Sequence, residues 1–386
     1  MVDEGRSRSR LHRMVPRDPE EPHRTASPLE LFFDLVFVVA VSAASAQLHH
    51  QLADAHPVEG VVSYAMVFFA IWWAWMNFTW FATSFSTDDW LYRVLTFVQM
   101  GGVLILAAGI GPAFHHDFTL AVLGYIVMRV AMIAQWLRAS RRAGDAQRTA
   151  RRYALGIAVV QLLWVGFLFI PAEFQVLGFI ALALAEIAVP VLSEMGGGST
   201  PWHPHHITER YGLFTLIVLG ESLLASAKAI IGAIEKVQTP WPLIAIAVLA
   251  LVATASLWWI YFWPPHHHAI GGLRQSIRYG YTHYLIFAAA GAFSAGIEVE
   301  IDRLIGASEL DAVAASLTVS VPIALFLLGV WFVAIRENAD RVVNTAVPLG
   351  AVLVLLDPVL PIPVALTAVI LAGIVVVLVL RPPLRG

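Results

Sequence analysis

The residues best suited to chemistry are acids and bases that lie inside long apolar segments. Glu30 and Asp34 are four residues apart near the start of one such segment, so they share one face of a helix. Glu186 and Glu221 lie inside later segments, and Arg129 lies near the middle of another. A charged side chain at the centre of a membrane helix costs about 2.5–3.5 kcal/mol on the insertion scale, so each of these residues needs a partner or a function.

Two interpretations explain these charges. In the first, they form buried ion pairs that fix helix packing, such as Arg129 with Glu221 or with Glu186. In the second, they line a polar path on which a carboxylate carries protons, or on which carboxylates and Arg129 hold a charged solute. For the second interpretation we assign Asp34 and Glu221 as the coupling or binding carboxylates, Arg129 as their counter-ion, and Glu186 as a further member of the path.

A second group of residues stands where apolar segments begin. Glu30 and Glu209 each occupy the start of an expected helix, where the helix dipole favours a carboxylate. Arg210 is placed to pair with either acid or with a lipid phosphate, and we assign these three residues to a gate at the cytoplasmic end. Gly220, next to Glu221, permits close helix packing or local unwinding.

The chain has 14 histidines, and several of them are clustered. His203, His205 and His206 are weak candidates for a metal site together with Glu209, because imidazole and carboxylate suit zinc, iron, nickel and manganese. No HExxH or spaced histidine pattern accompanies them, and we expect no cofactor. The pairs at 49–50 and 115–116 are predicted to lie on the opposite side and to bind nothing.

The composition defines what must position these side chains. Of 386 residues, 59% are hydrophobic and 13% are charged, whereas a soluble domain has about 25% charged residues. The mean hydropathy is +0.74. A water-soluble domain and a disordered chain are therefore excluded. The absence of cysteine excludes disulfides, thiolate metal sites and thiol nucleophiles, and no Walker loop or G-x-S-x-G motif is present.

Apolar runs with few charges predict an all-α bundle of twelve membrane helices. The segments lie near 29–48, 60–82, 91–111, 118–138, 153–171, 174–193, 207–231, 241–263, 279–298, 311–334, 343–358 and 361–380. Between the last two, Asp357, Pro358, Pro361 and Pro363 mark a tight hairpin, so a re-entrant pair is an alternative to two crossings.

The distribution of arginine and lysine predicts the orientation. With twelve crossings, most of these residues fall on one side, and Lys236 and Arg303 fall on the other. This asymmetry places both termini in the cytoplasm. Residues 1–28 are expected to form a disordered, Arg-rich cytoplasmic tail without a signal peptide, so that the first helix directs insertion into the bacterial plasma membrane.

The two halves of the chain show a weak internal repeat. Segments 29–38 and 208–217 each carry a glutamate at the start of an apolar helix, and the second and eighth helices share tryptophan-rich segments. We therefore expect two parallel six-helix repeats, 29–195 and 207–381, joined by a linker at 196–206. The tryptophans are expected to form aromatic belts at the membrane interface.

Three motifs carry a resemblance to a known family. Residues 27–37 read SPLELFFDLVF, residues 206–213 read HITERYGL, and residues 219–222 read LGES. Together they resemble the bacterial low temperature requirement protein A (LtrA) family over about residues 25–380. The resemblance implies a multi-pass bacterial membrane protein linked to growth in the cold, and it implies no defined reaction. The positions that match the family are Glu30, Asp34, His206, Glu209, Arg210, Gly220 and Glu221.

The leading hypothesis is a transporter or channel for a small solute or ion. Its expected partners are the lipid bilayer and that solute, with a homo-oligomer left open and no nucleic acid. Alternatives are an intramembrane metal-dependent enzyme acting on lipid, or a non-catalytic membrane sensor or scaffold. An enzyme is the second choice, because no covalent nucleophile can be assigned.

Overall fold

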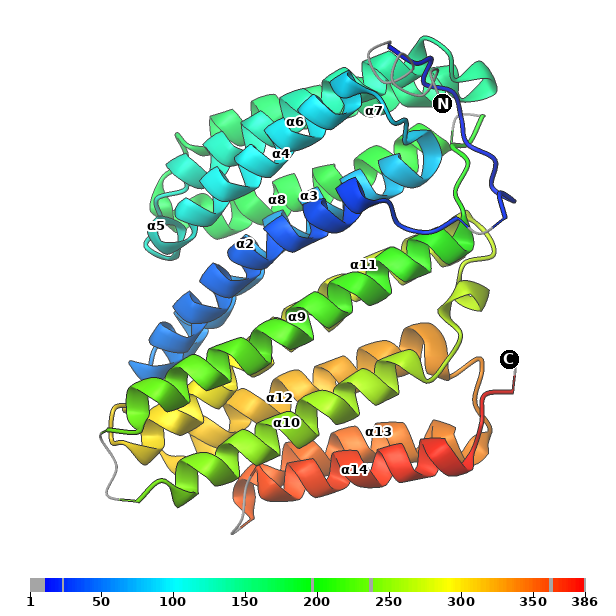
Figure 1. The fold of residues 1–386 in the computed structure, drawn as a ribbon. Helices are drawn as coiled ribbons and strands as arrows, with labels where there is room; N and C mark the ends of the chain where they lie inside the picture. The colour runs from blue at the N-terminus through cyan, green and yellow to red at the C-terminus, as the bar shows by residue number, and fades with distance from the viewer. Residues whose placement is uncertain (1–10, 23, 196–197, 236–238, 361–363, 385–386) are drawn as a thin grey trace, which may run out of the picture. The chain divides into compact units, whose positions relative to one another are not determined.

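The computed structural model describes residues 11–22, 24–195, 198–235, 239–360 and 364–384, and every regular element in these ranges is a helix (Figure 1). The long helices are α2 (Pro28–Ala53), α3 (Pro57–Phe85), α4 (Trp90–Ala108), α6 (Thr119–Ser140), α7 (Gln147–Phe167), α8 (Ala172–Glu194), α9 (Pro204–Ala233), α10 (Trp241–Phe262), α11 (Leu273–Leu304), α12 (Ala312–Val330), α13 (Arg341–Leu356) and α14 (Ala365–Leu380). Shorter turns are α5 (Ile110–Phe114), η1 (Gly144–Ala146), η2 (His266–Ala269), η3 (Trp331–Ile335) and η4 (Asp357–Val359). The prediction of an all-α fold is confirmed for the described residues.

Ten of the long helices in the described ranges are long and apolar enough to cross a membrane. All twelve segments expected from the sequence are helical over most of their length. Two of them fall outside the ten: α7 begins with a basic turn that holds Arg148, Arg151 and Arg152, and α14 has only 16 residues. The equally short α13 is among the ten because it continues into η4, as Arg341–Val359. The multi-pass architecture is therefore established, and the count of twelve crossings stays a prediction.

The helices begin at residues that either lack an N–H donor or provide an acceptor for one. Proline is the first residue of α2 and α3, where a missing N–H costs nothing. Asp89, Asp311 and Asp340 precede α4, α12 and α13, and each carboxylate accepts a hydrogen bond from the N–H three residues further on. These caps explain why each of these helices begins directly after its proline-adjacent or aspartate-capped boundary, where the apolar segment starts.

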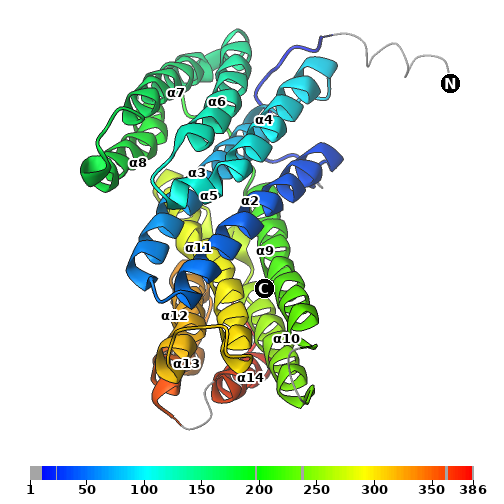
Figure 2. The same ribbon diagram turned by 90° about the vertical axis from the view of Figure 1, so that its left-hand side faces the viewer.

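The chain forms two compact units. The first contains residues 1–40 and 66–210, and the second contains residues 41–65 and 211–386, so that α2, α3 and α9 each contribute to both. Within the first unit, α4 packs on α6, α6 on α7 and α7 on α8 (Figure 2). Within the second unit, α11 packs on α12, α12 on α13, α13 on α14 and α14 on α10. In each unit, four successive long helices therefore pack in chain order: α4, α6, α7 and α8 in the first, and α11, α12, α13 and α14 in the second.

Glycine allows the closest of these helix contacts. A Cβ atom added to Gly124 of α6 would lie 2.4 Å from the backbone nitrogen of Leu106 on α4, and one added to Gly102 would lie 2.8 Å from the carbonyl oxygen of Gly124. Such contacts are typical of membrane helices that associate through small residues. Gly220 does not have this role, because it is exposed and a Cβ there would meet nothing within 4 Å.

The prediction that the tryptophans form interfacial belts is wrong for α3. Trp72, Trp73 and Trp75 are 1%, 0% and 0% exposed. The physical reason is their position along the helix, because both the expected segment 60–82 and the observed α3, Pro57–Phe85, place the tryptophans just beyond the centre rather than at the end. Trp258 and Trp259, by contrast, lie near the end of α10 and are 43% exposed each.

Much of the N-terminal tail packs against the end of α3, although we expected a disordered tail. The backbone N–H of Arg17 donates to the carbonyl oxygen of Ser84 at 2.9 Å. The guanidinium of Arg24 donates to the carbonyl oxygens of Ala82 at 2.9 Å and Thr83 at 2.6 Å. The carbonyl oxygen of Ala82 also accepts from the N–H of Ser86 at 3.0 Å, so Arg24 adds further donors and a positive charge to the last turn of α3.

The hairpin before α14 is organised by Asp357. Its Oδ2 atom accepts hydrogen bonds from the N–H of Val364 at 3.0 Å and of Thr367 at 3.1 Å, and from the hydroxyl of Thr367. The carboxylate therefore caps the first turn of α14. Pro361 and Pro363, which we expected in this hairpin, lie outside the described residues, as do Gly196 and Gly197 of the expected linker.

The second unit contains a buried network of two histidines and two tyrosines. His266 Nε2 donates to the carbonyl oxygen of Tyr261 at 2.7 Å, so its Nδ1 accepts from the hydroxyl of Tyr279 at 3.0 Å. His283 Nδ1 donates to the carbonyl oxygen of Tyr279 at 2.7 Å, so its Nε2 accepts from the hydroxyl of Tyr261 at 2.9 Å. Each imidazole uses both nitrogens as a neutral ring, and burial lowers the pKa of His266 to about 4.

Candidate functional site

A cluster of charged side chains lies in the first unit, at the N-terminal turns of α2 and α9. Glu30 and Asp34 come from α2, and His206 and Arg210 come from α9. Asp34 and Arg210 are each six residues beyond the proline that begins their helix, which corresponds to about 9 Å along the axis. Both are 0% exposed. The cluster is therefore buried inside helices that are long and apolar enough to span a membrane.

The strongest contact in the cluster joins Asp34 to Arg210. Arg210 Nε donates to Asp34 Oδ2 at 2.8 Å, and Arg210 Nη2 donates to Asp34 Oδ1 at 2.6 Å. The indole N–H of Trp75, on α3, donates to the same Oδ1 atom at 2.6 Å. This two-point contact between guanidinium and carboxylate fixes the orientation of both groups. The predicted counter-ion is thus corrected: Arg210, not Arg129, binds Asp34.

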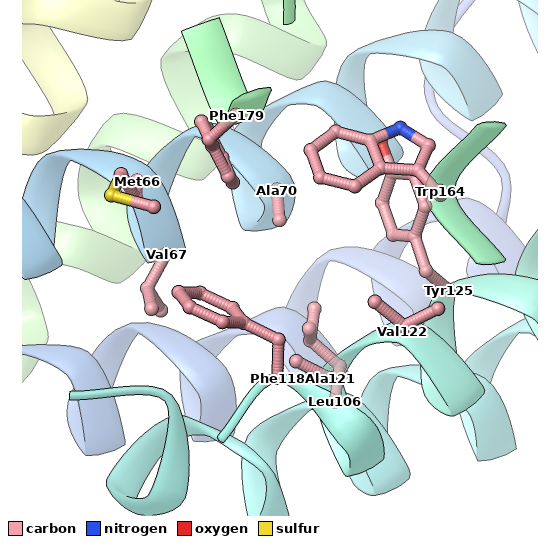
Figure 3. A pocket seen from close by; sticks show the side chains of 10 residues that line it. All are labelled: Met66, Val67, Ala70, Leu106, Phe118, Ala121, Val122, Tyr125, Trp164 and Phe179. Carbon is pink, nitrogen blue, oxygen red and sulfur yellow. The ribbon is translucent and has the colours of Figure 1, made fainter. Parts of the chain in front are cut away.

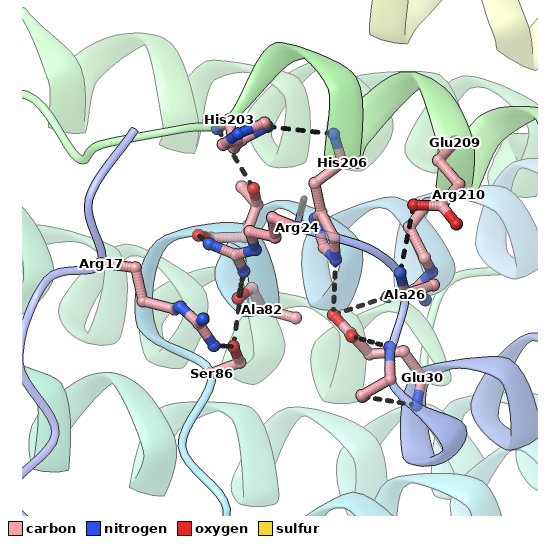
Figure 4. A network of polar contacts seen from close by, with 12 residues as sticks. Arg17, Arg24, Ala26, Glu30, Ala82, Ser86, His203, His206, Glu209 and Arg210 are labelled. Atoms are coloured by element: carbon pink, nitrogen blue, oxygen red, sulfur yellow. Dashed lines mark hydrogen bonds and ion pairs between the residues drawn. The ribbon is translucent and has the colours of Figure 1, made fainter. Parts of the chain in front are cut away.

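Glu30 connects the cluster to the start of α2 (Figure 4). Its Oε2 atom accepts from the N–H of Ser27 at 2.8 Å, while its own N–H donates to the hydroxyl of Ser27 at 3.3 Å, which is a capping box. Its Oε1 atom lies 3.2 Å from His206 Nε2 and 3.1 Å from Arg210 Nη1. Glu30 is therefore both a helix cap and the second acid of Arg210.

The hydrogen bonding of the cluster is not fully satisfied. Glu30 Oε1, His206 Nδ1 and Arg210 Nη1 are buried and make no hydrogen bond of good geometry within the described residues. Glu30 and Asp34 both contact the guanidinium of Arg210, and Glu30 also contacts His206 and lies within electrostatic range of Arg24. A group of this kind can bind and release a proton while the rest of the site stays in place.

Further polar residues surround the cluster on the side of the N-terminal tail (Figure 4). His203 caps α9, because its Nδ1 accepts from the N–H of His206 at 3.2 Å, and its Nε2 donates to the carbonyl oxygen of Glu21 at 3.0 Å. Glu209 accepts from the N–H of Ala26 at 3.1 Å. Burial, with a contribution from the nearby Arg17, lowers the pKa of Arg24 to about 10, and Glu30 opposes this shift.

Arg129 and Glu186 form a separate ion pair in the first unit. Arg129 Nη2 lies 3.2 Å from Glu186 Oε2 and donates to the hydroxyl of Tyr125 at 2.6 Å. The indole N–H groups of Trp73 and Trp164 donate to Glu186 at 2.7 Å and 3.2 Å. This is one of the two pairings expected for Arg129, and it joins α3, α6, α7 and α8.

A small cavity adjoins this second pair. It has a volume of about 30 Å³ and is lined by apolar side chains together with the rings of Tyr125 and Trp164 (Figure 3). This volume holds no more than about two water molecules, and its walls offer almost no polar partner. The pair of Arg129 and Glu186 therefore has the properties of a structural contact between helices rather than a solute site.

Glu221 falls in the second unit, separately from Asp34 and Arg129. Glu221 is 7% exposed and lies on α9. Glu221 and Lys228 both lie within electrostatic range of Glu298 on α11. The structure therefore does not place Asp34, Glu221 and Arg129 in one unit. In the same unit, His49 Nε2 contacts Asp302 Oδ2 at 2.8 Å, and the prediction that the pairs at 49–50 and 115–116 bind no ligand stays a prediction.

The candidate metal ligands are used in other ways. In the described ranges, no group of three or more histidine, aspartate or glutamate side chains has a geometry suitable for a metal ion. His203 and His206 face different partners, the carbonyl oxygen of Glu21 and the carboxylate of Glu30, while His205 is exposed. The structure therefore does not bring these three histidines together as a set of ligands.

The sequence interpretation missed two members of these sites, Trp73 and Trp75. Each donates its indole N–H to a buried carboxylate, Glu186 or Asp34. A signal was present in the sequence, because a tryptophan in the interior of a membrane helix needs an acceptor for its N–H. The tryptophans were instead assigned to the interface because tryptophan clusters are typical of aromatic belts.

The fold and the buried charges define an all-helical, multi-pass membrane protein. Comparison with known families gives a more specific assignment, because the family of the bacterial low temperature requirement A protein (LtrA) matches residues 25–380. The chain belongs to the LtrA family. It is also 31% identical over 246 residues to an uncharacterized protein of Rhizobium meliloti (strain 1021). That alignment covers 61% of this chain and 58% of the relative.

Proposed function

We propose that this LtrA-family protein moves a small solute or ion across the bacterial plasma membrane, with proton binding at the cluster of Glu30, Asp34, His206 and Arg210 as the coupling event. The observation that carries the proposal is that two buried carboxylates share one arginine, beside one buried histidine. A purely structural site is better served by balanced pairs or by apolar side chains, because buried ion pairs gain little stability.

The coupling follows from how the proton changes the contacts of Arg210. When Asp34 is ionised, it holds the guanidinium at two points and also accepts from Trp75. A proton on Asp34 removes its charge and one acceptor position, which weakens its contact with Arg210. The contact of Arg210 with the ionised carboxylate of Glu30 then remains. Since α2 and α9 are joined at this depth by these contacts, protonation changes the free energy that holds the two helices together. His206, which contacts Glu30, is the residue that accepts the proton from the cluster and releases it.

We further propose that the chain has twelve crossings in two parallel repeats, 29–195 and 207–381, with both termini in the cytoplasm. The shared order of helix packing supports the repeat, because α4, α6, α7 and α8 pack in the same order as α11 to α14. The distribution of arginine and lysine supports the orientation. The cluster then lies near the cytoplasmic face, where Glu209 completes the gate.

Reconstituted protein provides the test of transport. Liposomes that contain the protein and an internal pH-sensitive dye are exposed to a panel of monovalent ions, divalent ions and amino acids. At least one of these is expected to change the internal pH with the wild-type protein, and Asp34→Asn is expected to reduce that rate by at least about tenfold.

Glu186→Gln is the matched control, because it also removes a buried carboxylate that binds one arginine and tryptophan N–H groups. This variant is expected to keep the flux if it folds. Absence of any proton-linked flux across the panel, or equal flux in wild type and Asp34→Asn, would refute the proposal.

A further inference from the structure

A second cavity in the first unit lies beside the cluster and is larger than the cavity near Arg129. Its volume is about 530 Å³, and it is formed by the first turns of α2 and α4, the segment after α3, and Arg17 of the tail. Its charged and aromatic lining side chains are those of Arg17, Phe32, Asp88, Tyr92, Arg93 and Phe97. It lies where α3 ends, at Phe85, and where α2 and α4 begin, which is the depth of a membrane interface rather than of the hydrocarbon.

The walls of this cavity change from polar to apolar along the helix axes. Arg93 and Asp88 lie at the start of α4, whereas Phe97 lies seven residues beyond Trp90, about 10 Å further along the axis. On α2, Phe32 lies one turn inside the helix. Phe32 and Phe97 are 51% and 49% exposed, so the apolar part of the cavity is open. This is the order of chemical groups in a phospholipid, with a charged head followed by an acyl chain.

The polar end offers positive charge that is available to an anion. The side chain of Arg93 is 45% exposed and pairs with Asp88, whose side chain is 69% exposed. Exposed pairs of this kind contribute little stability, so a phosphate can replace Asp88 at small cost. Arg17 adds a second guanidinium that is 33% exposed in its side chain, although it also binds Glu21. Arginine recognises phosphate well because it donates two parallel hydrogen bonds.

Tyr92 gives an independent indication of a ligand. It lines the cavity and is 3% exposed, yet its hydroxyl makes no hydrogen bond within the described residues. A buried hydroxyl without a partner is unfavourable, and a ligand oxygen in the cavity would satisfy it. Tyr92 also lies within electrostatic range of Glu30 and Arg210, so this cavity adjoins the buried cluster.

We propose that this cavity binds one anionic glycerophospholipid. Arg93 and Arg17 bind the phosphate, the hydroxyl of Tyr92 donates to a phosphate or ester oxygen, and one acyl chain lies against Phe32 and Phe97. The lipid is a bound component of the protein and not its transported solute, so the site is independent of the transport proposal.

The test measures thermal unfolding of the purified full chain in a nonionic detergent during titration with phosphatidylglycerol. Phosphatidylglycerol is expected to raise the melting temperature more than phosphatidylcholine does. Arg93→Gln is expected to weaken the apparent affinity for phosphatidylglycerol by about tenfold. Tyr92→Phe is expected to weaken it several-fold while leaving the lipid-free protein equally or more stable, because it removes an unsatisfied hydroxyl.

Arg336→Gln is the matched control, because Arg336 is also a partly exposed arginine beside a carboxylate, lies 4.2 Å from the ring centre of Phe332, and is far along the chain from this cavity. It is expected to bind phosphatidylglycerol as the wild type does. Equal stabilisation by both lipids, or unchanged affinity in Arg93→Gln and Tyr92→Phe, would overturn the proposal. Full stabilisation by inorganic phosphate alone would also overturn it, since the site would then be one for a free anion.

Discussion

Replacement of Arg210 by methionine is expected to lower the free energy of unfolding by about 3–5 kcal/mol. The guanidinium is 0% exposed and contacts the carboxylates of both Asp34 and Glu30. Without it, Asp34 is left buried with the indole N–H of Trp75, and Glu30 is left with His206 and its cap. An unpaired buried carboxylate carries a large desolvation cost, which the variant must pay. Thermal unfolding of the detergent-solubilised protein measures the loss.

The control for this prediction removes both charges of the pair. In the double variant Asp34→Leu with Arg210→Met, apolar side chains of similar size replace the pair, and stability is expected to rise well above that of Arg210→Met. Glu30 also loses Arg210 in this variant but keeps its contacts with Ser27 and His206. The proton-linked flux of the double variant is nevertheless expected to be absent. If Arg210→Met alone unfolds at the wild-type temperature, the cluster does not have the buried contacts described above.

The second large effect is a loss of stability at acidic pH through His266. Burial, with a contribution from the nearby His267, lowers the pKa of His266 to about 4 from an ordinary value of 6.5, and the hydrogen bond to the carbonyl oxygen of Tyr261 opposes this shift. Between these two values the unfolded chain binds more protons than the folded chain. The contribution is therefore complete above pH 6.5 and is lost as the pH falls to 4, by about 3 kcal/mol in total.

Melting temperatures measured between pH 7 and pH 4 test this effect. His266→Gln is expected to be less stable than the wild type at pH 7 but to lose less stability on acidification, because the titrating group is gone. His268→Gln, in the same turn but exposed, is expected to follow the wild-type pH profile. A wild-type slope in His266→Gln would show that the Tyr–His network does not exclude the proton.

The sequence predicted the helices well because the physical signal is local. Apolar runs of about 20 residues, bounded by proline, glycine and capping aspartate, are enough to locate membrane helices. Their hydropathy also identified Asp34, Arg129 and Glu186 as charges that need partners. All three proved to be buried, at 0%, 2% and 1% exposure.

The partners of these charges could not be predicted in the same way. Arg210 and Asp34 are 176 residues apart in the chain, and their pairing depends on how α2 and α9 are rotated about their axes. Sequence position gives the depth of a residue along a helix, but not which neighbour its face contacts. For the same reason Arg129 was assigned to Asp34, although its face on α6 meets Glu186 of α8.

The tryptophans of α3 show the same limit. The expected segment 60–82 and the observed α3, Pro57–Phe85, have the same centre, so the position of Trp75 inside the helix was available from the sequence. The acceptor of its N–H, Asp34 on α2, depends on how the two helices pack and was not.

Infrared difference spectroscopy of the reconstituted protein tests most directly whether the cluster binds a proton. On stepwise acidification, a signal from a protonated carboxylic acid is expected to appear reversibly in the wild type, before unfolding. The signal is expected to persist in Glu186→Gln and to be lost or shifted in Asp34→Asn. An identical signal in Asp34→Asn and the wild type, or no reversible signal in the folded wild type, would contradict proton coupling at Asp34.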